Sequence, residues 1–118
     1  MDINGKDMPV KFGINQTDEF CQLRNMTLKE YYQLFAGFET GNYTFGVIRD
    51  LIWTALKDGA RQAGEEFTLT VYDVGDAMDG DPAKYISEAL SHLMESLPSP
   101  TDNGAAKKKK APVRAYKT

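Results

Sequence analysis

The stretch from Thr44 to Ala63 constrains the fold of this chain more than any other part of the sequence. Apolar residues recur in it every three or four positions, which places them along one side of an α-helix and predicts a buried stripe. We expect the helix to end at Ala63 because Gly64 suits a left-handed C-terminal cap, although Gly59 lowers helix propensity by about 1 kcal/mol relative to alanine. The stripe consists of Phe45, Ile48, Leu51, Ile52, Ala55, Leu56 and Ala60.

Two threonines mark the starts of further helices. Glu30 follows Thr27 at the third position, and Asp73 follows Thr70 at the same spacing. In such a capping box, each side chain accepts a hydrogen bond from the backbone N–H of the other residue. The helix after Thr27 should carry an apolar stripe of Leu28, Tyr31, Tyr32 and Phe35, and the helix after Thr70 a stripe of Val71, Val74 and Met78.

Glycine, proline and aspartate residues predict the remaining element boundaries between residues 37 and 97. We expect a loop between Gly37 and Gly41, and a short β-like fragment at 67–69. Asp81 caps a last helix that has Pro82 at its first position, where the missing N–H costs no hydrogen bond. The stripe of this helix is Ile86, Ala89, Leu90, Leu93, Met94 and Leu97.

The N-terminal segment favours a small β-hairpin. Asn4 and Gly5 supply the positive φ angles of a tight turn, and the alternation of apolar and other residues from Val10 to Ile14 predicts an extended arm. Asn15 then suits the N-cap of a short helix with two carboxylates in its first turn, ending near Asn25. The predicted fold class is mainly α, with about five helices, an N-terminal β-hairpin and a disordered basic C-terminal tail.

Length and composition predict one soluble globular domain, residues 1–97, followed by a tail, residues 98–118. The chain has 118 residues, of which 42% are hydrophobic and 26% charged, and its one cysteine cannot form an internal disulfide. Neither a membrane-spanning apolar run nor a signal-peptide pattern is present in the sequence, so we expect a cytosolic protein.

Charge divides the chain into two unlike parts. Residues 1–97 carry a formal charge of −8 and residues 98–118 a charge of +5, with four consecutive lysines at Lys107–Lys110. An acidic body argues against a nucleic-acid-binding face, so any contact with nucleic acid would come from the tail. The tail has few large apolar residues and should be disordered in isolation.

Residues that could carry chemistry do not form a recognisable motif. The acidic run Asp73, Asp76, Asp79 and Asp81 fails the spacing of a calcium loop, and one cysteine with one histidine cannot make a zinc site. Cys21 and His92 have only their residue types in favour of a thiol dyad. We therefore expect no catalytic residue, metal or cofactor, and a protein that is not an enzyme.

Aromatic residues are the candidates for partner binding. Their side chains, on two of the predicted helices and, for Phe38, in the predicted loop, either widen the core or anchor a partner in a groove, and the sequence leaves both interpretations open. The candidate partner-binding residues are Tyr31, Tyr32, Phe35, Phe38 and Trp53.

The order of segments from Ile3 to Leu97 resembles the tail assembly chaperones of long-tailed bacteriophages and related prophages. The resemblance rests on INGKDMPVKFGI, MTLKEYYQLF, LIWTALKDGARQAG and LTVYDVGDAMDGD, followed by an amphipathic helix. It implies a mainly helical protein that binds the long helical tape-measure protein before the tail tube forms, and that acts in the host cytoplasm without remaining in the virion.

The same resemblance implies a second, longer product of the gene. In many phages a ribosomal frameshift near the end of the gene adds a segment that recruits tail tube protein, and Lys107–Lys110 is where such a slip would occur here. Self-association is compatible with this role. The alternatives are a cytosolic helical adaptor for another amphipathic helix, and a protein that contacts nucleic acid through its basic tail.

Overall fold

A computed structural model describes residues 1–96 as five helices preceded by a two-stranded antiparallel hairpin. This mainly helical architecture confirms the predicted fold class, while Leu97 and the predicted disordered tail lie outside the described residues. The described helices all fall short of the combined length and apolar character that a bilayer crossing requires. The elements are β1 (Asp2–Ile3), β2 (Lys6–Asp7), α1 (Ile14–Leu23), α2 (Leu28–Thr40), α3 (Phe45–Ala63), α4 (Val71–Met78) and α5 (Pro82–Ser96).

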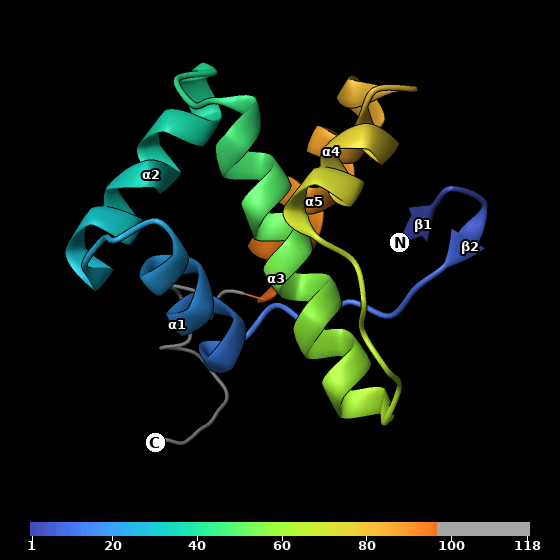
Figure 1. Ribbon diagram of the computed structural model, residues 1–118. Coiled ribbons are helices and arrows are strands. Elements are labelled where there is room, and N and C mark those ends of the chain that lie inside the picture. The colour runs from blue at the N-terminus through green and yellow to red at the C-terminus, as the bar shows by residue number, and fades with distance from the viewer. Residues whose placement is uncertain (97–118) are drawn as a thin grey trace, which may run out of the picture.

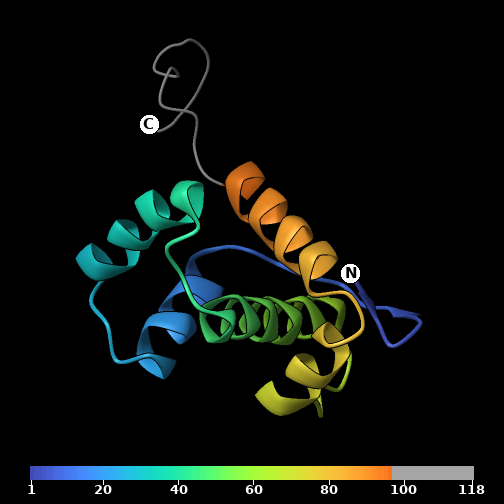
Figure 2. The same cartoon turned by 90° about the horizontal axis from the view of Figure 1, so that it is seen from above.

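Helix α3 is the centre of the fold (Figures 1 and 2). Helices α1, α4 and α5 all pack against it. Its predicted boundaries are confirmed: the Thr44 side chain accepts a hydrogen bond from the Val47 N–H, and Gly64 ends the helix at φ 71°. The predicted stripe is buried apart from Phe45, which is 66% exposed at the helix start.

Both capping boxes are present. Thr27 pairs reciprocally with Glu30 at the start of α2, and Thr70 with Asp73 at the start of α4. These local signals were sufficient to locate both helix starts because a side-chain cap satisfies backbone N–H groups that have no partner within the helix.

Removing either threonine should destabilise the domain. We expect Thr27→Ala and Thr70→Ala each to lower the free energy of unfolding by about 1 kcal/mol, because each change leaves helix N–H groups without their side-chain partner. Urea denaturation followed by far-ultraviolet circular dichroism measures the loss. Serine at either position should retain most of the stability, and an equal loss with serine would show that the cap is not the cause.

The N-terminal hairpin has the predicted turn but shorter strands. Asn4 and Gly5 have φ angles of 55° and 84°. The predicted arm from Val10 to Ile14 is wrong as a strand, since β2 ends at Asp7. The chain instead crosses α3, where the Lys11 N–H donates to the Ala55 carbonyl at 3.0 Å, so its hydrogen bonding is to a helix and not to a second strand.

Helix α1 begins earlier than predicted. Its N-cap is Gly13, without a side-chain hydrogen bond, and Asn15 lies inside the helix. The capping preference of Asn15 is worth only about 1 kcal/mol, and it yields to packing that buries Gln16 and Phe20. The Gln16 amide donates to the Thr54 hydroxyl at 3.2 Å, which fixes this part of α1 on α3.

A buried carboxylate also joins α1 to α3. Asp50 is 4% exposed and accepts from Arg24 at 2.6 Å and from Arg49 at 3.0 Å. Because Arg24 is the C-cap residue of α1, this cluster holds the C-terminal end of α1 against α3. The short connection from Arg24 to Thr27 then sets where α2 starts.

Two predictions for the segments on either side of α3 are wrong: the end of α2 and a strand at 67–69. Helix α2 continues through Gly37 to Thr40, because one glycine inside a helix costs only about 1 kcal/mol and Gly41, at φ 75°, provides the cap. Residues 67–69 form no strand, since no neighbouring strand pairs with them in the described part of the chain. The Leu69 carbonyl instead accepts from the Trp53 indole N–H at 2.8 Å.

Candidate binding groove

An apolar groove lies where α1, the first turns of α2 and the end of α5 meet. It has a volume of about 610 Å³ and collects side chains from three helices and from the segment that precedes α1. We call it the apolar groove. Its lining residues are Phe12, Gly13, Ile14, Thr17, Asp18, Cys21, Gln22, Met26, Leu28, Tyr31, Tyr32, Leu93 and Ser96.

Large apolar side chains at the groove are exposed. Ile14 is 87% exposed, Tyr32 55% and Leu28 54%. Single exposed apolar residues are normal on a protein surface, but several gathered around one hollow mark an interaction site. The arrangement can bind an apolar surface without any chemical step.

The floor of the groove is aromatic and buried. Tyr31 is 2% exposed and makes edge contacts with Phe20 and Phe35, at ring-centroid distances of 5.6 and 5.2 Å. Burial raises the pKa of the Tyr31 hydroxyl, and its hydrogen bond with Thr17 partly opposes the rise. The hydroxyl therefore stays neutral at physiological pH, and the floor carries no charge.

Cys21 lines the same groove as a protonated thiol. Burial raises the pKa of this thiol, and the Asp18 carboxylate adds to the rise. A protonated thiol is a poor nucleophile. His92, the other member of the dyad considered from sequence, stacks on Phe12 with ring centroids 5.9 Å apart and is not a lining residue of the groove.

The five candidate partner-binding residues lie in three different places. Tyr31 and Tyr32 belong to the apolar groove, one on its floor and one at its edge. Phe35 is partly buried and Phe38 is buried, and both continue the aromatic row of α2 away from the groove. Trp53 is on α3, outside the groove, where it holds the loop before α4.

Trp53 has contacts that account for its position. Its indole ring packs against Phe67 at a centroid distance of 6.0 Å, and the Lys57 ammonium group lies 5.1 Å from the ring centre. Together with the hydrogen bond to Leu69, these contacts satisfy both the apolar body and the polar edge of the indole.

Sequence reasoning missed the groove residues that come from outside α2. Phe12 and Leu93 are far apart in the chain and were assigned to a strand and to a core stripe, and Ile14 was assigned to the same strand. Only the packing of α1 and α5 against α3 brings them together. The one available local signal was Leu28, which shares the helical face of Tyr31 and Tyr32.

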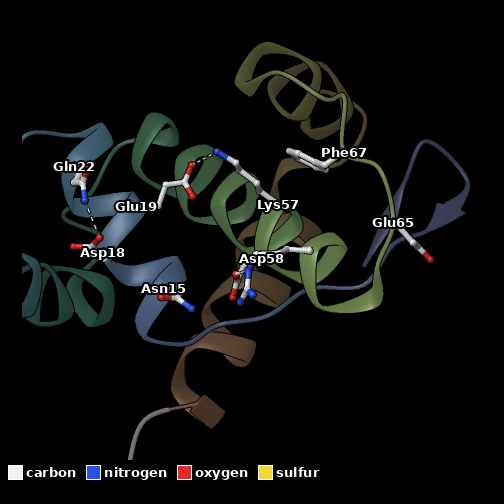
Figure 3. Close-up of a pocket in the computed structure, with 9 residues that line it drawn as sticks. Asn15, Asp18, Glu19, Gln22, Lys57, Asp58, Glu65 and Phe67 are labelled. Carbon is white, nitrogen blue, oxygen red and sulfur yellow. Dashed lines mark hydrogen bonds and ion pairs between the residues drawn. The ribbon is translucent and has the colours of Figure 1, made fainter.

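A larger hollow, of about 760 Å³, lies between α1 and α3 but is polar (Figure 3). Four of its six charged side chains are paired with one another: Lys57 with Glu19, and Arg61 with Asp58 at 2.7 Å. These paired charges already satisfy one another, and Lys57, Glu19 and Arg61 are also exposed to solvent, which makes this hollow a weaker candidate than the apolar groove.

Comparison of the chain with protein-family models, with curated protein sequences and with solved structures finds no match.

Proposed function

We propose that this protein is a tail assembly chaperone of a long-tailed bacteriophage or prophage, and that its apolar groove binds an amphipathic helix of the tape-measure protein. The observation that carries the proposal is the gathering of Ile14, Leu28 and Tyr32, all exposed, around one groove. The order of sequence segments that resembles this family supplies the identity of the partner.

The geometry of the groove suits a helix as its ligand. A helix presents apolar side chains at three- and four-residue spacing, and a groove between other helices receives such a stripe. Fully burying one large apolar side chain is worth about 1.5–3 kcal/mol, so three or four such contacts offset the cost of association. The carboxylate of Asp18 at the groove favours a partner helix with a basic residue beside its stripe.

The acidic body suits the second requirement of a chaperone, which is solubility. A formal charge of −8 on residues 1–97 makes copies repel one another while each covers an apolar segment of its partner. In this proposal the protein acts in the host cytoplasm, needs no cofactor, and leaves before the virion is complete. A longer product made by frameshifting at Lys107–Lys110 would recruit tail tube protein.

Co-expression with the long helical protein encoded immediately downstream tests the proposal. We expect that protein to become soluble and to co-purify with this chain, and both effects to be lost in a Leu28→Gln, Tyr32→Gln variant. Equal solubility of the downstream protein with and without this chain would refute the chaperone role. The codons for Lys107–Lys110 test the longer product separately, because it requires a slippery heptamer and an open overlapping frame.

A helical adaptor for another amphipathic partner is the second candidate, since it would use the same groove. The gene neighbourhood separates the two: the chaperone requires tail genes and a very long helical reading frame beside it. Binding of DNA or RNA through Lys107–Lys110 would be independent of the groove and would be abolished by deleting residues 98–118.

Cys21 provides a direct reporter of groove occupancy. Because burial and Asp18 raise the pKa of its thiol, we expect alkylation in the native protein to accelerate at higher pH than in the urea-unfolded chain. A helix bound in the apolar groove should slow alkylation further. Stopped-flow alkylation with iodoacetamide across pH 7–10 measures both effects, and identical pH profiles for the native and unfolded chains would contradict the first.

A further inference from the structure

A second, smaller groove lies between the start of α3 and helix α4. It has a volume of about 320 Å³ and is walled by two exposed aromatic rings, Phe45 at 66% and Tyr72 at 73% exposure. Gly46 and Gly75 form part of its lining, so the backbone is accessible between the rings. The lining also contains the carboxylates of Asp76 and Asp79, which we call its acidic edge. We call the whole surface the α3–α4 groove.

Local folding does not account for the acidic edge. Of the four aspartates in this part of the chain, Asp73 caps α4 and Asp81 accepts from the Lys84 N–H at the start of α5. Asp76 lies in the last turn of α4 and Asp79 is its C-cap residue, where the helix dipole disfavours negative charge. No lysine or arginine among residues 1–96 forms an ion pair with either carboxylate.

The one cation in the α3–α4 groove is already engaged, as far as the described residues go. Arg49 binds Asp50 at 3.0 Å, and its guanidinium carbon lies 5.8 Å from the centre of the Tyr72 ring. It therefore supports one aromatic wall and leaves the outer edge negative. A ligand for this surface needs positive charge for the carboxylates and an apolar or aromatic group for the rings.

We propose that the α3–α4 groove binds the basic C-terminal segment of the same chain, residues 107–116. That segment, KKKKAPVRAY, combines a lysine run with Val113, Arg114 and Tyr116, which matches an acidic edge beside two aromatic rings. It is also the most basic part of the chain, at a formal charge of +5 for residues 98–118 against −8 for the rest. The proposal is independent of what the apolar groove binds.

The connection is long enough for the segment to reach. Helix α5 runs from Pro82 to Ser96, so Ser96 lies about 21 Å along its axis from Pro82, which lines the α3–α4 groove. Residues 97–106 span about 33 Å when extended, which covers this distance. Tethering at this length gives an effective concentration in the millimolar range, which favours the segment of the same chain over that of a second copy.

Paramagnetic relaxation in solution tests the proposal on the full-length protein. A nitroxide label is placed at Ala111→Cys in a Cys21→Ala background, and amide signals are recorded with nitrogen-15. We expect the α4 amides from Gly75 to Asp79 to lose about twofold in intensity at low salt and to recover it at about 1 M salt, where the Debye length is about 3 Å. Full intensity in α4 at low salt would overturn the proposal.

Matched variants identify the groups responsible. Asp76→Asn with Asp79→Asn should abolish the broadening, whereas Glu39→Gln with Glu66→Gln, which removes the same charge from other exposed positions, should leave it in place. Equal effects of the two pairs would reduce the contact to general attraction and overturn the site.

Two further measurements test where the segment comes from and where it docks. Broadening of α4 in an unlabelled, nitrogen-15 chain mixed with labelled chain would assign the contact to a second copy and overturn the intramolecular proposal. Broadening confined to residues of the apolar groove, such as Leu28, would place the segment elsewhere and also overturn it.

Discussion

Replacing Gly59 with alanine is expected to lower the free energy of unfolding by about 3 kcal/mol, near the upper end of overpacking costs. A Cβ atom at this position would lie 2.3 Å from the Pro9 carbonyl oxygen and 2.8 Å from the Val10 Cα. Both are backbone atoms of the segment that crosses α3. They cannot rotate away as a side chain would, so the crossing segment must lift from the helix.

The sign of this effect separates packing from helix propensity. In an open helix, alanine for glycine stabilises by about 1 kcal/mol, so propensity alone predicts the opposite result. Gly46, on the same helix, is the matched control, because a Cβ there meets no atom closer than 3.7 Å. Gly46→Ala should therefore leave stability unchanged or raise it.

Urea denaturation of the native protein, Gly59→Ala and Gly46→Ala measures their free energies of unfolding. Since residues 1–96 pack around one helix, we expect a single transition with a lower midpoint and an unchanged slope for Gly59→Ala. Loss of the Lys11 to Ala55 hydrogen bond should appear as faster amide exchange at Lys11. A Gly59→Ala protein as stable as the native one would mean that the segment does not cross α3 at this point.

Local signals explain why much of the helical fold could be predicted. Thr27 and Thr70 each have a reciprocal partner three residues later, and Gly64 ends α3 in a left-handed conformation. Each signal acts within one turn of the backbone, so it is visible in a short stretch of sequence. The turn at Asn4 and Gly5 belongs to the same class.

Contacts between distant segments explain what could not be predicted. Gly59 appeared to be a weakness in α3, but its role is to admit Pro9 and Val10. Helix α1 has Gly13 as its N-cap, and not the predicted Asn15, because the buried Gln16 amide hydrogen-bonds to Thr54 on α3. Neither reason is present in the local sequence, since each depends on where another segment packs.

Only the part of the apolar groove that lies on α2 could be predicted from the sequence. Tyr31 and Tyr32 were identifiable as aromatic residues on one face of α2, and they lie on the floor and at the edge of the apolar groove. Leu93 was identifiable only as a stripe residue of a different helix. Amphipathic periodicity reports which face of a helix is apolar, but it does not report which other helix will leave that face open.

The largest expected effect on function comes from two exposed residues of the apolar groove. We expect Leu28→Gln with Tyr32→Gln to weaken binding of the downstream-encoded helical protein by about 100-fold, which corresponds to about 2.7 kcal/mol. Both residues are on α2 and more than half exposed, so the loss reflects apolar contact between their exposed faces and the partner, while the Tyr32 ring also contacts Tyr31 and Phe35 within the domain. Glutamine preserves charge and helix propensity, which separates this contact from electrostatic and folding effects.

Leu23→Gln is the control for this pair of substitutions. Leu23 is an exposed apolar residue of α1, 46% accessible, and it is not part of the groove lining. If binding uses the apolar groove, the Leu23 variant should bind within about twofold of the native protein while the double variant fails. Comparable losses in the two variants would indicate general surface hydrophobicity as the cause. Titration calorimetry with the co-purified partner fragment gives the affinities, and unchanged thermal midpoints establish that the variants are folded.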